Sequence, residues 1–531
     1  MSSSIEAAGR LIADLVAAGV RDVVLSPGSR SAPIAYVVAA AEREGRLRLH
    51  VRHDERSAAF LGLGIGRADP DHPAVVVTTS GSAVANLVPA AMEAHHGGVP
   101  LLLVTADRPH RLRGTWANQT SDSQGKLLQS IAYCMDIDPV TCEGTPWIDA
   151  LLAAKGGTVR RPGPAHLNVC FDVPLQPPPD HRVVLPVASS PMETDAEDPD
   201  LGSAELKLGP RTVVVAGDGA GLEATALALK GRWPLLAEPT SGARFGSARV
   251  DAYRLVLPGL ADRVQRVVVY GRPTLSRPVT SLLDDERVQV IQVVRHPDDL
   301  GPGRDVVRVG AVTVDGSDDP AWLYEWAGAG LTRSMDAMEA IDAWPVVTGL
   351  HVAQAIAAAT RPEDALFIGS SNAVRDLDLV ASELSPAALI VANRGLAGID
   401  GAISTAAGVA VASGRPTRAY LGDLTLLHDI NGLAIPTIER ERLRLQIVVA
   451  NDDGGGIFAT LEHANHPEAF ERVFGTPVGA DLASLCAGYG VVHRKVQLVD
   501  LPDALADIPL GVTVVEIVTS RANLARLHAT L

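Results

Sequence analysis

Residues 444–458 read RLQIVVANDDGGGIF, an apolar run of strand length that ends in acidic residues and glycines. An earlier run, TRAYLGD at residues 417–423, ends in a similar way with Gly422 and Asp423. A helical stretch separates the two runs, and the order strand, helix, strand is typical of neighbouring parallel strands. Asp423 and Asp452 would then both lie at the carboxyl ends of strands, the edge where open α/β sheets bind their ligands.

The same alternation of short apolar runs and helical stretches recurs in three blocks along the chain. Such alternation predicts a parallel sheet with helices on both faces. We therefore predict an α/β protein with three doubly wound parallel-sheet domains, at residues 1–180, 206–340 and 341–531. Residues 181–205 are rich in Pro, Ser and acidic residues, which favours a linker.

The composition suits domains of this kind. Of 531 residues, 47% are apolar and 20% charged, which is enough apolar material to bury a sizeable core. Aromatic residues make up 4%, so small aliphatic residues fill the interior, as in sheets buried on both faces. The net charge of −16 argues against nucleic acid or an anionic membrane as a partner, because both attract basic surfaces.

Several features favour a cytoplasmic location. The four cysteines form no C-x-x-C pair, which is typical of reduced thiols in a cytosolic protein. The N-terminal residues predict an amphipathic helix and lack the basic and apolar regions of a signal peptide. Apolar runs such as PLLLVTA have strand length, well short of the ~18–20 residues of a membrane span. We expect no membrane insertion.

The two acidic strand ends suggest a metal site. Asp423 and Asp452, with a glycine-rich backbone beside them, offer oxygen ligands of the kind that Mg²⁺ prefers, with phosphate and water completing its shell. Gly422 would let a diphosphate approach the backbone, and the following helix would offer N–H donors. Spacing alone leaves the alternative open that these are ordinary polar turns at strand ends.

Glu55 lies at a similar junction in the first block. The stretch HVRHDERSAAFLGLGIGRAD, residues 50–69, passes from an apolar run through His53, Asp54 and Glu55 into a helix rich in Ala and Gly. A carboxylate at a helix N-terminus is favoured by the helix dipole, and that ordinary explanation is sufficient for Glu55 taken alone. The small side chains of the helix predict that other groups pack closely against it.

Taken together, these stretches resemble the motif of thiamine-diphosphate (ThDP) enzymes, usually Gly-Asp-Gly followed by Asn-Asn. The chain departs from it at Leu424 and at Asp452, although Asp is still a competent oxygen ligand. The resemblance implies that Asp423, Asp452 and the carbonyl of Gly454 bind Mg²⁺, or Mn²⁺. It implies the following cofactor-binding residues: Glu55, Gly422, Asp423, Leu424, Asn451, Ile399 and Ile457. Glu55 would hydrogen-bond N1′ of the aminopyrimidine, and Ile399 would hold the cofactor bent.

Longer motifs narrow the resemblance. SPGSRSAP at 26–33, TADRP at 105–109, NQT at 118–120 and NRGLAGIDGAISTAAG at 393–408 are similar to those of the 2-succinyl-5-enolpyruvyl-6-hydroxy-3-cyclohexene-1-carboxylate (SEPHCHC) synthases, the MenD family of menaquinone biosynthesis. This family decarboxylates 2-oxoglutarate and adds the resulting succinic-semialdehyde carbanion equivalent to isochorismate by 1,4-addition, which gives SEPHCHC and CO₂. Leu424 after Gly-Asp is typical of this branch.

The resemblance also assigns substrate residues, many of them arginines, which suit two dianionic substrates. It implies an isochorismate side formed by Ser29, Arg30, Arg108, Gln119 and Arg277. It implies contacts with the substrate and intermediate from Ser371, Arg375, Arg394, Ile457 and Phe458. Catalytic roles would fall to Glu55, Arg394, Arg375 and Ser371. Any one of these arginines alone could equally be an ordinary surface residue.

The family fold comprises a pyrimidine-binding, a central transhydrogenase-like and a diphosphate-binding domain. Its cofactor lies between subunits, which implies at least a dimer, and a tetramer is the family habit. The alternatives are another ThDP-dependent 2-keto acid decarboxylase or acetolactate-synthase-like enzyme, and a cofactor-free relative. A dinucleotide enzyme is the weakest alternative, because Leu222 replaces the third Gly of G-x-G-x-x-G after Gly217-Asp218-Gly219. We interpret that stretch as a structural turn.

Overall fold

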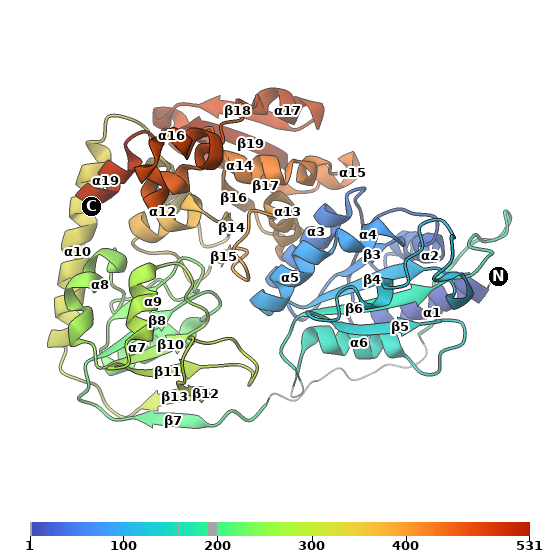
Figure 1. Cartoon of the computed structure of the whole chain (residues 1–531), viewed down its shortest axis with the longest axis horizontal. Coiled ribbons are helices and arrows are strands. Elements are labelled where there is room, and N and C mark those ends of the chain that lie inside the picture. The colour runs from blue at the N-terminus through green and yellow to red at the C-terminus, as the bar shows by residue number, and fades with distance from the viewer. Residues whose placement is uncertain (1–2, 158–159, 189–198) are drawn as a thin grey trace. The chain divides into compact units, whose positions relative to one another are not determined.

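The computed structural model describes residues 3–157, 160–188 and 199–531 (Figure 1). The chain forms two compact units. The N-terminal unit comprises Met1–Asp198 with two later segments, Gly395–Gly414 and His428–Leu443. The C-terminal unit comprises the rest, and it contains two of the three large sheets. The domain boundaries at residues 180, 205 and 340 remain predictions.

The N-terminal unit is built on a six-stranded, fully parallel sheet of order β2-β1-β3-β4-β6-β5. Its strands are β1 (Asp22–Leu25), β2 (Arg48–Val51), β3 (Val75–Thr78), β4 (Leu101–Asp107), β5 (Tyr133–Ile137) and β6 (Pro164–Cys170). All of them except β5 are short apolar runs of the kind whose alternation with helical stretches predicted this domain. The edge strand β5 was not predicted, because its side chains are mostly half-exposed and include an Asp.

Helices cover both faces of this sheet, as predicted. Alternate strand residues, such as Val75 and Val77, share a core with α1 (Ser3–Ala17), α2 (Ala32–Arg43) and α6 (Pro146–Lys155). The opposite face packs against α3 (Glu55–Ala68) and α5 (Val88–Gly97). A Cβ added at Gly62 of α3 would lie 2.5 Å from the Val76 side chain, so the helix sits directly on the sheet.

The small side chains of α3 are explained by a second helix of the same unit, α13 (Ala402–Ser413). A Cβ at Gly64 would lie 2.1 Å from the carbonyl oxygen of Thr405 on α13. Conversely, a Cβ at Gly408 of α13 would lie 2.2 Å from the carbonyl oxygen of Leu61. The two backbones therefore approach more closely than any side chain would allow.

The C-terminal unit begins with a five-stranded parallel sheet of order β12-β11-β10-β8-β9. The strands are β8 (Thr212–Ala216), β9 (Leu235–Ala237), β10 (Arg266–Tyr270), β11 (Gln289–Val293) and β12 (Val307–Val309). Helix α7 (Leu222–Gly231) covers one face, and α8 (Tyr253–Leu260) and α9 (Arg277–Asp284) cover the other. Two further strands, β7 (Ser203–Leu206) and β13 (Ala311–Val314), pair with each other in parallel. Strand β7 starts inside the predicted linker, of which residues 189–198 lie outside the described residues.

The last sheet of this unit has six parallel strands in the order β15-β14-β16-β17-β19-β18. They are β14 (Ala365–Ile368), β15 (Leu389–Val391), β16 (Thr417–Gly422), β17 (Arg444–Asn451), β18 (Val492–Val496) and β19 (Gly511–Val518). One face packs against α11 (Gly349–Ala359) and α12 (Asn372–Val380). The edge strand β18, which is largely exposed, was not predicted.

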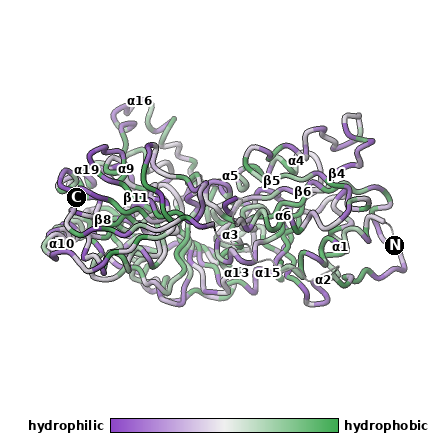
Figure 2. Tube along the Cα trace, turned by 90° about the horizontal axis from the view of Figure 1, so that it is seen from below, coloured by the Kyte–Doolittle hydropathy of each residue, from purple (hydrophilic) through white to green (hydrophobic). Residues whose placement is uncertain are grey.

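The predicted fold class is thus confirmed, with three large parallel sheets in a chain of alternating strands and helices. The longest helix is α10 (Ala321–Asp342), which leads into the last sheet. Among the described residues, no helix is both long enough and apolar enough to cross a membrane. Figure 2 shows polar and apolar segments interchanging along the chain.

Candidate cofactor and substrate sites

Strands β16 and β17 bring the two predicted metal ligands to one edge of the sheet. Gly422 at the end of β16 pairs with Ala450 of β17, so Asp423 lies one residue and Asp452 two residues beyond this pair. The Asp423 side chain is buried at the start of α14 (Asp423–His428). A Cβ added at Gly422 would meet no atom within 4 Å, so open space lies beside this backbone.

The carboxyl groups at this edge have strongly perturbed pKa values. Burial raises the pKa of Asp423 to about 6, although the backbone N–H groups of Asp423, Leu424 and Gly454 act in the opposite direction. Burial, and then the charge of Asp423, raise the pKa of Asp452 to about 7. The N–H of Gly454 also stabilises the charged form of Asp452, so one backbone group serves both carboxyls.

Asp376 on α12 is a further acidic group near this edge, and the sequence analysis missed it. Burial raises its pKa to about 7, and the charge of Asp452 adds to the effect. Asp376 Oδ2 lies 2.3 Å from the position that a Cβ would take at Gly349, so its carboxyl is tightly enclosed. Asp376 comes near this edge through the packing of α12, and no spacing of residues in the sequence reveals that packing.

The donor set at this edge fits a magnesium ion that carries a phosphate ligand. Within the described residues, no group of three or more His, Cys, Asp and Glu side chains is arranged as a metal site. Mg²⁺ does not require one, because it is usually held by one or two carboxylates while phosphate and water supply the other oxygens. The glycines make room for such a site: a Cβ at Gly456 would lie 2.0 Å from Asp452 Oδ2.

The other predicted cofactor and substrate residues near this edge differ in their burial and in their contacts. Asn451 donates from Nδ2 to Glu516 Oε1 (2.9 Å) and accepts from the N–H of Asp453 (3.0 Å), so its side chain is engaged within the unit. Leu424 and Ile457 are half-buried. Phe458, on a short 3₁₀ turn (Gly456–Thr460), packs against the rings of His463 and Phe474 at centroid distances of 5.4 and 5.5 Å.

Three predicted substrate residues of the C-terminal unit lie near one another. Arg375 on α12 donates to the carbonyl of Ser371 at 2.7 Å. Burial, the charge of Arg394 and that of Arg254 lower the pKa of Arg375, so three guanidinium groups are neighbours. Arg394 is 3% exposed and donates to Thr274 Oγ1 at 2.7 Å. Arg254 lies on α8 and Thr274 in the loop after β10, and neither residue was predicted from the sequence.

Arg277, by contrast, is exposed and paired. It is the first residue of α9, and it forms an ion pair with Glu462 at 2.7 Å, with both side chains more than two-thirds exposed. Surface pairs of this kind contribute little to stability. Arg277 is thus a surface residue whose guanidinium is paired with a carboxylate of the same unit.

In the N-terminal unit, Glu55 occupies the first turn of α3 without capping it. The cap is Asp54, whose side chain accepts hydrogen bonds from the N–H groups of Arg56 (2.9 Å) and Ser57 (3.3 Å). The half-buried Glu55 side chain instead accepts a hydrogen bond from Asn86 Nδ2 at 3.0 Å. Asp54 therefore caps the helix, while Glu55 lies in the first turn, where the ordinary explanation, a favourable interaction with the helix dipole, still applies.

Two predicted isochorismate residues of this unit form a basic cluster. Arg30 donates to the carbonyl of Phe171 at 2.8 Å, and its buried Nε has no hydrogen-bond partner among the described residues. Arg108 donates to Ser80 Oγ at 2.6 Å and to the carbonyl of Asn118. Burial and the nearby charges of Arg108 and Arg111 lower the pKa of Arg30. Ser29, beside Arg30, is exposed.

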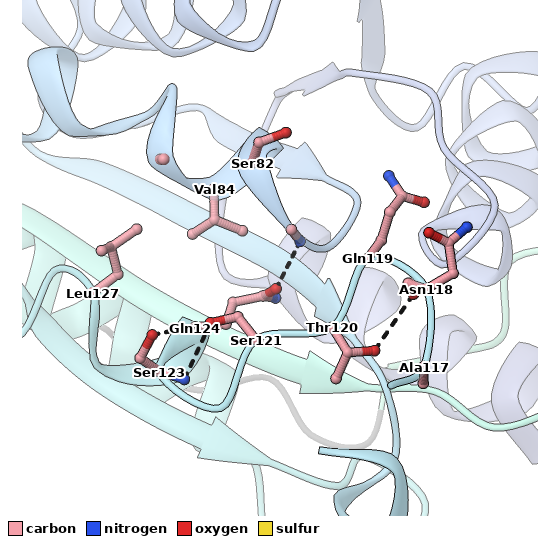
Figure 3. A pocket seen from close by; sticks show the side chains of 12 residues that line it. Ser82, Val84, Ala117, Asn118, Gln119, Thr120, Ser121, Ser123, Gln124 and Leu127 are labelled. Carbon is pink, nitrogen blue, oxygen red and sulfur yellow. Dashed lines mark hydrogen bonds between the residues drawn. The ribbon is translucent and has the colours of Figure 1, made fainter. Parts of the chain in front are cut away.

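Gln119 lines a cavity of about 580 Å³ within the N-terminal unit (Figure 3). The loop that carries Gln119 and the segment that carries Ser82 both line this cavity. Every lining residue is uncharged, and most carry a hydroxyl or an amide: Ser82, Asn118, Gln119, Thr120, Ser121, Ser123 and Gln124, with Gly81, Val84, Ala85, Ala117 and Leu127. A volume of this size suits a small-molecule ligand. Only Gln119 was predicted, because the other polar residues have no distinctive spacing.

Two other predictions concern loops. Ile399 is half-buried in the loop before α13, where the N–H groups of Gly395 and Leu396 donate to Glu93 at 2.6 and 2.7 Å. The Gly217-Asp218-Gly219 stretch turns from β8 towards α7. A Cβ at Gly217 would lie 2.0 Å from the backbone nitrogen of Pro273, so glycine is needed there for packing, in agreement with a structural turn.

Comparison with known proteins identifies the family. Residues 6–127 match the family described as "Thiamine pyrophosphate enzyme, N-terminal TPP binding domain". A protein of Kineococcus radiotolerans is 45% identical over 98% of this chain and 97% of its own length. Proteins of a Nocardioides species (44%, over 98% and 96%) and of Mycobacterium marinum (39%, over 100% and 99%) are also similar. All three are named 2-succinyl-5-enolpyruvyl-6-hydroxy-3-cyclohexene-1-carboxylate synthase. The chain belongs to this SEPHCHC synthase family of thiamine pyrophosphate-dependent transferases.

Proposed function

We propose that the chain decarboxylates 2-oxoglutarate and adds the remaining four-carbon unit to isochorismate, which gives SEPHCHC and CO₂ for menaquinone biosynthesis. The observation that carries the proposal is the pair Asp423 and Asp452 at the ends of adjacent parallel strands, in a chain with near full-length similarity to proteins of that name. The Arg-rich substrate positions favour dianions over pyruvate, the substrate of the alternative enzymes.

The cofactor would be bound mainly by its diphosphate. Asp423, Asp452 and the carbonyl of Gly454 would hold Mg²⁺, or Mn²⁺, and the open space beside Gly422 would receive the diphosphate. The other proposed cofactor contacts are those that the resemblance implies: Leu424, Asn451, Ile457 and Ile399. Once bound, thiamine diphosphate supplies the electron sink that allows a 2-oxo acid to lose CO₂.

Glu55 would hold a proton at N1′ of the aminopyrimidine. Its carboxylate is half-buried, is not used for helix capping and has one oxygen engaged by Asn86. A carboxyl group in hydrogen-bond contact with a ring nitrogen can donate and accept the proton that general acid–base catalysis requires. This role would account for the position of a carboxylate at the junction between β2 and α3.

The arginines would bind the two anionic substrates. In the C-terminal unit, Arg375 and Arg394 lie near each other, which is unfavourable until an anion separates their charges. With Ser371, Ile457 and Phe458 they would bind the donor substrate and the intermediate. In the N-terminal unit, Arg30 and Arg108 would bind a carboxylate of isochorismate, while Ser29 and Gln119 supply neutral hydrogen bonds. Arg277 would contribute to isochorismate binding by exchanging Glu462 for a carboxylate of the substrate.

We further propose a cytoplasmic homo-oligomer, at least a dimer and by family habit a tetramer. The defining experiment follows isochorismate by its ultraviolet absorbance in the presence of 2-oxoglutarate, ThDP and Mg²⁺, with each omitted in turn. Loss of isochorismate that requires all three supports the proposal. Decarboxylation or condensation of pyruvate with no loss of isochorismate would instead favour the decarboxylase or acetolactate-synthase alternative.

A further inference from the structure

Asn86 is the hydrogen-bond donor that the structure supplies to the side chain of Glu55. Its Nδ2 lies 3.0 Å from Glu55 Oε2. Among the described residues, Glu55 Oε1 has no hydrogen-bond partner. The backbone N–H groups at the start of α3 are served by Asp54, so they do not hold Glu55 in place. The orientation of the Glu55 carboxylate therefore depends on one amide.

This arrangement suits a carboxyl group that must present one oxygen to a ligand. A half-buried Glu side chain has several rotatable bonds, and each orientation that does not face the ligand reduces the fraction of productive molecules. A donor on Oε2 fixes the plane of the carboxylate and leaves Oε1 for the ligand. We propose that Asn86 is a positioning residue that orients Glu55 towards the cofactor, an inference that rests on the proposed role of Glu55.

Asn86 is itself held by a short, well-anchored segment. It follows α4 (Ser82–Ala85), and its N–H donates to the carbonyl of Ser82 at 3.3 Å. The turn before α4 uses Gly81 at φ 84°, a conformation that favours glycine. The N–H of Gly81 donates to Gln124 Oε1 at 3.0 Å.

Gln124 fixes that turn to the sheet. It is 3% exposed, and its Nε2 donates to the carbonyl of Ala106 at 3.1 Å and to Asn168 Oδ1 at 2.8 Å. Ala106 lies on β4 and Asn168 on β6, so the amide ties the turn to two central strands. Ser80, the residue before Gly81, accepts a hydrogen bond from Arg108. The donor to Glu55 is thus placed by the rigid part of the unit.

The same segment forms one wall of the cavity that Gln119 lines (Figure 3). Gly81, Ser82, Val84 and Ala85 all face that cavity, and Asn86 is the next residue. The proposed isochorismate side and the hydrogen-bond donor to Glu55 therefore lie on one short piece of chain. A change in Asn86 alone leaves the cavity wall intact, which allows its effect on Glu55 to be tested separately.

The test compares Asn86→Ala and Asn86→Asp in the full-length chain. Asn86 has ordinary backbone angles, φ −67° and ψ −16°, and an exposed side chain, so both variants should fold with near-unchanged melting temperatures. Asp keeps the shape of Asn but loses the donor and repels Glu55. Gln497→Glu is the control, because it makes the same amide-to-carboxylate change at an exposed position.

Two measurements define the expected result. The dissociation constant of ThDP in excess Mg²⁺, from calorimetry, should rise about 3- to 10-fold in Asn86→Ala and more in Asn86→Asp, the range of one lost hydrogen bond. Turnover at saturation should fall by roughly tenfold or more, while the KM values of both substrates change less than about twofold. The Gln497→Glu variant should match the parent in both.

A double-mutant cycle on ThDP binding separates positioning from structure. In a Glu55→Ala background, Asn86→Ala should cause no further loss of ThDP affinity, because its effect acts through Glu55. An equal loss with and without Glu55, or no loss at all in the parent background, would overturn the inference. If Glu55→Ala itself binds ThDP and turns over normally, the proposed role of Glu55 falls instead, so the two failures are distinct.

Discussion

Asp423 and Asp452 lie together beyond the ends of adjacent parallel strands, where the charge of Asp423 raises the pKa of Asp452. Asp423 is buried and Asp452 half-buried, and two such carboxyls with raised pKa values destabilise the fold when both are ionised. Their burial makes physical sense if a cation is bound between them. The same ionised carboxylates that would attract a cation therefore lower the stability of the metal-free protein.

Replacing Asp423 by Asn should separate those two properties. The pKa of Asp423 is raised to about 6 from 3.8, so its contribution to stability is present below about pH 4 and is lost as the pH rises through about 6. Near pH 8 the metal-free Asp423→Asn variant should be more stable than the parent, by up to roughly 3 kcal/mol. It should lose the gain in melting temperature that Mg²⁺ with ThDP gives the parent.

The measurement is thermal and urea unfolding with and without Mg²⁺ and ThDP. Asp305→Asn is the matched control, because Asp305 is exposed and should show neither effect. A variant that keeps the full ligand-dependent gain would exclude Asp423 as a metal ligand.

The sequence predicted the parts of the fold that apolar patterning encodes. Central strands such as β3, β4 and β17 are continuous apolar runs, and they were recognised because both of their faces are buried. The edge strands β5 and β18 have half-exposed, polar sequences and were missed. The packing of α13 against α3 depends on a close approach of the two backbones. The glycines of α3 predicted that some group packs closely there, but they could not identify α13 as that group.

The candidate site was predictable only where it coincides with motifs. Glu55 and Asp423 stand at strand ends, so topology alone brings them to the ligand-binding edge of their sheets. Asn86, Gln124 and Asp376 act through contacts made by tertiary packing, and their surroundings in the sequence resemble many ordinary turns and helices. Such residues are identified from distances between atoms in the folded structure, and their positions along the sequence do not reveal them.

The contact between α3 and α13 should tolerate no side chain at Gly64. A Cβ there would lie 2.1 Å from the Thr405 carbonyl oxygen, and backbone cannot move aside cheaply. Gly64→Ala should lower the free energy of unfolding by about 1–3 kcal/mol or more, as overpacking does. Urea unfolding of the full chain measures this.

Gly328→Ala provides the contrast. Gly328 lies inside α10, and a Cβ there would meet no atom within 4 Å. Ala is the better helix former, so this variant should gain about 0.5–1 kcal/mol. Equal effects of the two substitutions would show that helix propensity, rather than the close packing of α3, determines the outcome.

Arg394 should be needed as an arginine for use of 2-oxoglutarate. It is buried, lies near Arg375 and donates one hydrogen bond to Thr274, so its remaining N–H groups can form a bidentate contact with a carboxylate. Lysine keeps the charge but loses that geometry. Arg394→Lys should lower kcat/KM for 2-oxoglutarate by about 10- to 100-fold, with a much smaller change in the KM of isochorismate.

Steady-state kinetics with each substrate varied in turn provides the measurement. Arg333→Lys, an exposed change on α10, should have no effect. A rise in the KM of isochorismate with no change for 2-oxoglutarate would mean that Arg394 binds isochorismate instead.

Glu238 should make stability depend on pH. It is 2% exposed, and burial raises its pKa from 4.5 to about 8 despite the N–H of Leu275, with Asp378 adding to the rise and Arg394 opposing it. The folded protein therefore binds a proton that the unfolded chain has released between about pH 4.5 and about pH 8. Stability from this group should fall across that interval and level off above it.

Glu238→Gln removes this dependence and keeps the structure. The Oε1 of Glu238 accepts hydrogen bonds from the N–H groups of Thr274 (3.0 Å) and Leu275 (2.9 Å), and a Gln oxygen can accept both. The variant should gain stability over the parent as the pH rises from about 5 to about 8, by a few kcal/mol in all. Urea unfolding at intervals of about one pH unit measures the difference. Glu286→Gln, at an exposed position, is the control, and its free energy of unfolding should vary with pH as that of the parent does. The same result for Glu238→Gln would mean that Glu238 is ionised in the folded protein across this pH range.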